Sequence, residues 1–145
     1  MKYLKSLSFV LSVLVVGSTF TSCQDPEKLK TDQYYAEGYS LYTTHCANCH
    51  QEDGKGMANL YPPFQGSEYL DNKELFICIT RNGLAGEIEV AGKKYNRPMP
   101  ANPGLKDIEI AEIVTYVYNT WGGETRYTPT DSVTQVLTRC TTPTK

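Results

Sequence analysis

Apolar residues recur at helical spacing in three segments of the chain, residues 34–44, 71–82 and 107–120. Such spacing puts the apolar side chains on one face of a helix, where they can pack against a core. The most regular stripe lies in the last segment and consists of Ile110, Ile113, Val114 and Val117. The pattern predicts three main helices, followed by a weaker helical stretch at 131–139 in a tail rich in threonine and proline.

Polar residues and glycines mark the ends of these helices. Asp71 is followed three residues later by Glu74, which together form a capping box that opens the second helix. Asn82 and Gly83 both tolerate a left-handed backbone, so they are expected to end it. A glycine pair at 122–123 ends the third helix in the same way.

A short hairpin is predicted between the second and third helices. Residues 87–90 alternate polar and apolar side chains, as a strand with one buried face does. Ala91 and Gly92 supply a turn, and the second strand is expected to end near Tyr95. The fold class predicted from these patterns is therefore all-α, with one short β-hairpin before the last helix.

The first 22 residues have the features of an export signal. Lys2 and Lys5 give a positively charged start, and residues 7–16 are almost wholly apolar. This run is shorter than the roughly 20 residues that a membrane-spanning helix needs, so we interpret 1–22 as a signal peptide. Cys23 follows directly and resembles the lipidated cysteine of the bacterial lipobox. The alternative is an ordinary signal peptide with Cys23 incidental, because phenylalanine stands three residues before it, where leucine is usual.

Export and lipidation together predict a protein of the bacterial periplasm or cell envelope, anchored at the membrane surface. Behind the lipidated cysteine, the polar residues of 23–33 are expected to form a flexible tether. Residues 34–123 then form one small domain, and 124–145 a C-terminal extension. After removal of the signal, 12 of the 14 basic residues remain against 16 acidic ones. This balance argues against nucleic-acid binding, which needs a basic surface.

The most informative chemistry is the run Cys46, Ala47, Asn48, Cys49 and His50. Two thiols at this spacing can reach the two vinyl groups on one porphyrin edge, and the next residue can bind the iron from the same side. A thioredoxin-like redox pair would need a βαβ context, and a structural zinc site would need a second ligand pair at close spacing. The motif therefore predicts one covalently attached haem c.

The order of elements makes the chain resemble a class I cytochrome c. That order is a first helix, the haem motif, a proline-rich loop, a methionine loop and a last helix, over about residues 34–121. The resemblance implies a cytochrome c fold, in which the N- and C-terminal helices pack together and helices and loops wrap one haem. Local similarity is closer still to small cytochrome domains that accompany periplasmic quinoprotein dehydrogenases and copper nitrite reductases. The segments that carry it are 83–86, 95–96, 99–100 and 116–122.

The resemblance assigns roles to individual positions. Gly38 and Tyr42 match the positions where the family packs its first helix against its last, at Ile113 and Tyr116. Pro62 matches the proline whose carbonyl accepts the N–H of the haem-binding histidine and so orients its ring. Two positions depart from the family pattern, Gln51 in place of a common glycine and Lys106 in place of a Ser or Thr cap.

The resemblance also implies a methionine as the second axial ligand. Met99 lies between the hairpin and the last helix, where the family places this ligand, and flanking prolines stiffen its loop. Met57 follows the haem motif too closely to reach the far face, and His45 lies on the attachment turn. The expected pair of iron ligands is therefore His50 and Met99.

Two cysteines, Cys78 and Cys140, remain after the others are assigned. In an oxidising compartment they suggest a disulfide that would join the tail to the 71–82 helix. The alternative is two free thiols, with Cys78 buried as a small apolar residue.

A His/Met haem without a catalytic set of residues predicts a one-electron carrier and not an enzyme. Expected partners are redox proteins, such as a terminal oxidase, a quinoprotein dehydrogenase or a nitrite reductase, together with the membrane surface. One alternative is a haem peroxidase or gas sensor with an open or displaceable sixth site, for which Arg97, Asn96 and Tyr95 are the nearby polar groups. Another is a structural lipoprotein that carries no haem.

Overall fold

The computed structural model describes residues 25–140, so the signal peptide and Cys23 lie outside the described residues. Within this part the chain is mostly helical and carries one two-stranded antiparallel sheet, which confirms the predicted fold class. The elements in order are α2 (Pro26–His45), α3 (Ala47–His50), the 3₁₀ helix η2 (Glu68–Asp71), α4 (Lys73–Asn82), β1 (Ile88–Val90), β2 (Lys93–Tyr95), α5 (Asp107–Thr120) and α6 (Thr130–Leu137). No helix among residues 25–140 is long and apolar enough to cross a bilayer.

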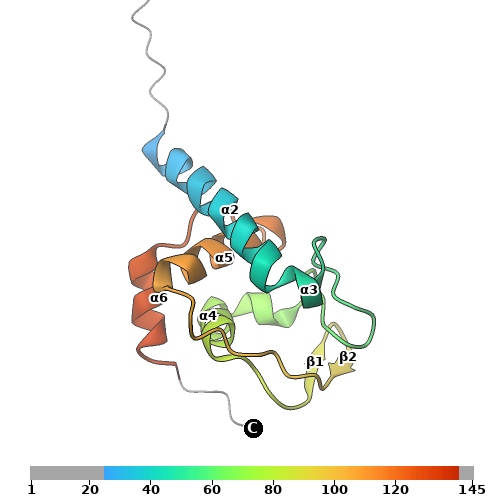
Figure 1. Ribbon diagram of the computed structural model, residues 1–145. Helices are drawn as coiled ribbons and strands as arrows, with labels where there is room; N and C mark the ends of the chain where they lie inside the picture. The colour runs from blue at the N-terminus through green and yellow to red at the C-terminus, as the bar shows by residue number, and fades with distance from the viewer. Residues whose placement is uncertain (1–24, 141–145) are drawn as a thin grey trace, which may run out of the picture.

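The first and last helices of the domain cross at a glycine. Figure 1 shows α2 passing over α5, and a Cβ placed at Gly38 would overlap the backbone carbonyl of Glu112. The missing side chain therefore allows the two backbones to approach closely. Beside this crossing Tyr42 and Ile113 are fully buried in the core. The expected packing of the first helix on the last is confirmed.

The first helix begins earlier than the sequence pattern indicated. Residues 26–33 were expected to lie in a flexible tether, but they form the first two turns of α2. Local chemistry supports this start, because the Asp25 carboxylate accepts a hydrogen bond from the N–H of Glu27 at 3.0 Å and Pro26 occupies the first turn. An exposed ion pair between Lys28 and Asp32, at 2.6 Å, adds to it.

The C-terminal extension supplies the remaining reason for the longer helix. Tyr34 is buried against Tyr127, with ring centroids 5.1 Å apart, and its hydroxyl lies 2.9 Å from Thr130 Oγ1. Arg126 pairs with Glu27 at 2.6 Å. These contacts join residues that are about a hundred positions apart, so the periodicity of one segment could not show them.

The second and third main helices differ in how well their starts were predicted. At α4 the cap is Asn72, whose side chain accepts from the N–H of Leu75 at 3.0 Å, and the predicted cap Asp71 instead ends η2. The α5 helix has the predicted bounds, Asp107–Thr120. At its start the N–H of Lys106 donates to the carboxylate of Glu109 at 2.6 Å, which is half of a capping box despite the lysine.

The hairpin has the predicted position, with its second strand ending at Tyr95. Ile88 pairs with Tyr95 and Val90 with Lys93, while Ala91 and Gly92 both have positive φ. Two consecutive residues with positive φ are typical of the two-residue turns that suit the twist of paired strands.

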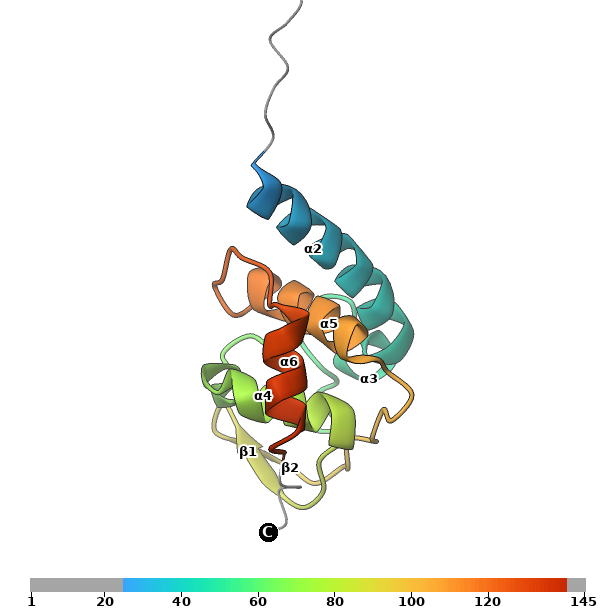
Figure 2. The ribbon, with the colours of Figure 1, turned by 90° about the vertical axis from the view of Figure 1, so that its left-hand side faces the viewer.

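The C-terminal extension packs onto the domain through α6. Figure 2 shows α6 lying against α5 and α4, and Val133 on α6 is fully buried. A disulfide joins Cys140, just beyond α6, to Cys78 on α4, with the two Cα atoms 5.6 Å apart. Asp107 at the start of α5 accepts a hydrogen bond from Thr134 of α6 at 2.7 Å.

Candidate haem-binding site

The attachment motif lies where α2 ends and α3 begins. Cys46 is the residue between the two helices, and its carbonyl accepts the N–H groups of Cys49 at 3.1 Å and His50 at 2.9 Å. This tight turn places two free thiols and one imidazole on one side of a cavity. Burial, and then the neighbouring Cys49, raise the pKa of the Cys46 thiol to about 12, so the unattached thiol is neutral near pH 7.

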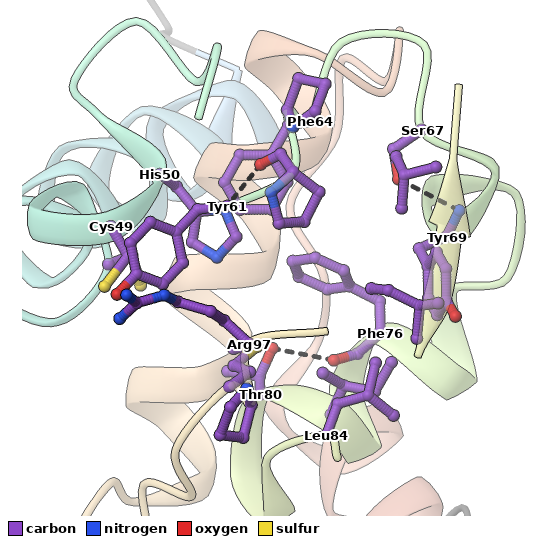
Figure 3. Close-up of a pocket in the computed structure, with 18 of the residues that line it drawn as sticks. Cys49, His50, Tyr61, Phe64, Ser67, Tyr69, Phe76, Thr80, Leu84 and Arg97 are labelled. Atoms are coloured by element: carbon purple, nitrogen blue, oxygen red, sulfur yellow. Dashed lines mark hydrogen bonds between the residues drawn. The ribbon is translucent and has the colours of Figure 1, made fainter. Parts of the chain in front are cut away.

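The imidazole of His50 is oriented by the loop that follows it. Its Nδ1–H donates to the backbone carbonyl of Pro62 at 3.1 Å, which leaves Nε2 available to a metal. Figure 3 shows this bond and the ring of His50 projecting into the cavity. Burial lowers the pKa of His50, although the Pro62 bond acts in the opposite direction, and a neutral ring is the form that binds iron.

A glycine allows the loop to return to His50. Gly56 has φ +68, and a side chain there would overlap the carbonyls of Tyr61 and Pro62. The N–H of Gly56 also donates to the carbonyl of His50 at 2.9 Å. The loop is therefore closed by its own backbone, which brings the Pro62 carbonyl within reach of the ring.

Met99 lines the same cavity as His50, on a separate segment of the chain. Its backbone forms a bridge with Leu84, with N–H to carbonyl distances of 2.8 and 3.0 Å. This pairing fixes the loop next to the end of α4. Met57 is 37% exposed in a turn with Tyr61, and exposed His45 lies in the last turn of α2, so neither lines the cavity.

The cavity walls are largely apolar. Aromatic and aliphatic side chains from α4, the hairpin and α5 form them, among them Phe76, Ile79, Val90, Ile113 and Val117. The space between the walls, counted out to the open mouth, is about 950 Å³. Figure 3 shows Phe76 and Leu84 on the other side of the cavity from His50. A flat apolar macrocycle fits such walls.

A single cation accompanies these apolar walls. Among the described residues that line the cavity, Arg97 alone carries a full charge, and its guanidinium lies over the ring of Tyr61 at 5.8 Å. Arg97 lines the cavity, whereas its neighbours Tyr95, which is buried in the hairpin, and Asn96, which is exposed, do not. The donor set of two thiols, an oriented imidazole and a thioether fits a covalent haem.

Comparison with known proteins agrees with this geometry. The family model for cytochrome c matches residues 35–121, which include α3, the hairpin and α5. The chain belongs to the cytochrome c family, whose members carry covalently bound haem c and use it to transfer electrons. Family membership removes the alternative of a haem-free structural protein.

The aligned region is a different share of each relative's length. Cytochrome c-552 of Thermus thermophilus is 39% identical over 92 residues, which are 60% of this chain and 70% of that protein. A second cytochrome c-552 of the same species is also 39% identical, and the chain covers 62% of its length. The cytochrome c subunit of the quinone alcohol dehydrogenase of Gluconobacter oxydans is 28% identical over 103 residues. Those are 69% of this chain but only 21% of that subunit.

Two aromatic residues that no sequence pattern marked lie beneath the histidine. The ring of Phe64 lies 4.5 Å from that of His50, and the indole of Trp121 stacks on Phe64 at 5.3 Å. Phe64 follows the Pro62–Pro63 pair, so its nearness to His50 could have been inferred from the role expected of Pro62. The position of Trp121 depends on how α5 ends against the haem loop, which the sequence pattern does not show.

Proposed function

We propose that this protein is a mono-haem electron carrier in which Cys46 and Cys49 hold the haem covalently and His50 and Met99 bind its iron. The observation that carries this proposal is that an oriented imidazole and a thioether line one apolar cavity. When bound, the haem supplies an iron that gains and loses one electron.

The residues around the site would keep both ligands in place during the transfer. The Pro62 carbonyl holds His50 through Nδ1, and the bridge to Leu84 holds the Met99 backbone. A ligand set that does not change between the two oxidation states keeps the reorganisation energy small. The apolar walls and the neutral thioether would favour the less charged ferrous state and so raise the reduction potential.

A carrier role is favoured over catalysis by what faces the cavity. Among the described residues that line the cavity, His50 is the one histidine and would be committed to the iron, and no aspartate or glutamate lies beside it. Arg97 is the observation that favours the competing function, a peroxidase or gas sensor, because such sites use a polar group near an open iron position. Rapid carbon monoxide binding by the reduced wild-type protein would support that competitor.

We further propose export and lipidation at Cys23, so that the carrier would act at the bacterial envelope. The positively charged start and the apolar run at 7–16 support this. Redox proteins are the proposed partners, with a terminal oxidase, a quinoprotein dehydrogenase and a nitrite reductase as candidates. The similarity to a cytochrome c subunit of a quinone alcohol dehydrogenase supports the second of these.

Two experiments test the proposal. Protein produced with haem-attachment machinery should retain its haem in acidified acetone, and Cys46→Ala/Cys49→Ala should lose the haem adduct by mass spectrometry. A full adduct on that double variant would contradict the attachment. Separately, Cys23→Ser should move the protein from the membrane to the soluble periplasmic fraction without altering its visible spectrum. A wild-type protein that is already soluble would contradict lipidation.

A further inference from the structure

A continuous series of aromatic rings runs from beneath His50 towards the surface. Phe64 lies 4.5 Å from His50, Trp121 stacks on Phe64 at 5.3 Å with an interplanar angle of 18°, and Tyr116 meets Trp121 edge-on at 5.5 Å. All of these distances join ring centroids and fall within direct contact range for aromatic pairs. The series therefore begins on the side of the iron that His50 is proposed to occupy.

The series ends at two exposed tyrosines on α2. The ring of Tyr116 lies 5.1 Å from Tyr35 and 5.5 Å from Tyr39, which are 39% and 48% exposed. Neither of these surface tyrosines lines the haem cavity. The rings thus connect the proximal side of the site to a surface that is separate from the cavity mouth.

Tryptophan and tyrosine side chains can give up one electron. Phenylalanine is not oxidised at ordinary potentials, so Phe64 would serve only as a contact between His50 and Trp121. Ferric haem with His/Met ligands is too weak an oxidant to remove an electron from tryptophan or tyrosine. The aromatic series therefore carries no electrons during ordinary electron transfer. Hydrogen peroxide is a much stronger oxidant once it displaces Met99 and reacts at the iron. Only then can an electron leave Trp121 and be replaced from Tyr116 and the surface.

We propose that Trp121 and Tyr116 relay oxidising equivalents from the haem pocket to Tyr35 and Tyr39, and so protect the haem when hydrogen peroxide reacts there. The inference rests on the proposed haem site. One hydrogen peroxide takes two electrons and two protons and leaves as two waters. Each surface tyrosine in turn loses one electron, and its O–H bond breaks with release of one proton, which gives two tyrosyl radicals per peroxide.

The relay ends on α2 because the tyrosines there can release a proton to water. The hydroxyl of Tyr42 also belongs to this aromatic cluster, but it is fully buried and donates to the carbonyl of Gln51 at 2.6 Å. Burial also raises the pKa of Tyr116, so this phenol holds its proton more tightly than an exposed one. The exposed phenols of Tyr35 and Tyr39 can pass their protons to water, so a radical is most stable there.

The test treats the ferric holoprotein with hydrogen peroxide and follows two readouts, loss of the Soret band and the sites of tyrosine oxidation mapped by mass spectrometry. Trp121→Phe keeps an aromatic ring but breaks the relay. Tyr35→Phe/Tyr39→Phe removes only its exposed end, where folding is not at risk. Tyr127→Phe is the matched control, because Tyr127 pairs with Tyr34, and no aromatic contact among the described residues joins that pair to Trp121.

In the wild type and in Tyr127→Phe, oxidation should be concentrated at Tyr35 and Tyr39 while most of the haem survives. Trp121→Phe should bleach its haem several-fold faster per peroxide consumed and lose most of that tyrosine oxidation. The double tyrosine variant should bleach faster as well. Equal bleaching in all variants, unchanged tyrosine maps, or a wild type in which no tyrosine is oxidised would overturn the relay. Reversible one-electron reduction, measured in the same samples, tests the carrier function separately.

Discussion

The phenol of Tyr42 on α2 donates a hydrogen bond of 2.6 Å to the backbone carbonyl of Gln51, the residue directly after His50. Gln51 has φ 63 and ψ 160, a conformation that is nearly restricted to glycine. The bond links the crossing of α2 and α5 to the loop that orients His50. A strained backbone is therefore held in place at the haem-binding turn by a buried side chain.

Gln51→Gly should stabilise the protein by about 1 kcal/mol. Glycine removes a backbone strain of roughly 1–3 kcal/mol, but it also raises the conformational entropy of the unfolded chain, which offsets part of that gain. The free energy of unfolding in urea, measured on the holoprotein, is the readout. Gln51→Ala is the control: it shortens the side chain but keeps the unfavourable φ, so it should not stabilise. Equal gains from both variants would show that backbone strain is not the cause.

Met99→Ala should abolish a weak near-infrared charge-transfer band of the oxidised protein, lower its reduction potential and open the iron to carbon monoxide. The reason is that a neutral thioether favours ferrous iron and blocks the sixth position. Absorption spectra and potentiometry measure these effects. Met57→Ala, at an exposed methionine outside the cavity, should change none of them. An unaltered spectrum in Met99→Ala would remove Met99 as the ligand.

Cys140→Ser should cost about 4 kcal/mol of stability while the visible spectrum stays unchanged. The disulfide to Cys78 spans 62 residues, and in the chain-entropy account a loop of that length constrains the unfolded state by about this much. Chemical denaturation gives the value, and reduced wild-type protein should match the variant. A much smaller loss would mean that α6 is held to α4 mainly by packing.

Gly38→Ala should destabilise the protein by about 3 kcal/mol, because its Cβ would overlap the carbonyl of Glu112 and force α2 away from α5. Thermal unfolding measures the loss. Ser40→Ala, at an exposed position of the same helix, should be neutral or slightly stabilising. If the two variants unfold at the same temperature, the crossing tolerates wider spacing than its geometry indicates.

Acid should loosen the attachment of α6 through Asp107. The hydrogen bond from Thr134, and then the ion pair with Arg81 at 2.7 Å, hold the pKa of Asp107 below its ordinary value of 3.8. A lowered pKa in the folded state means that this contribution is present above pH 3.8 and is lost as the pH falls below it. Melting temperatures taken between neutral and strongly acidic pH should fall less steeply for Asp107→Asn than for the wild type. Thr134→Val, which keeps the carboxylate, should show an intermediate slope.

The sequence by itself determined the features whose causes are local. The haem motif at 46–50 could be recognised because its chemistry needs adjacent residues, and α5 and the hairpin could be placed because side-chain period and turn residues decide them. Tertiary structure decided what depends on distant segments. It placed Met99 on the cavity of His50, extended α2 to Pro26 through contacts with 126–130, and brought Cys78 to Cys140. It also assembled the rings from Phe64 to Tyr39, because only the close crossing at Gly38 brings α2 and the end of α5 together around Trp121.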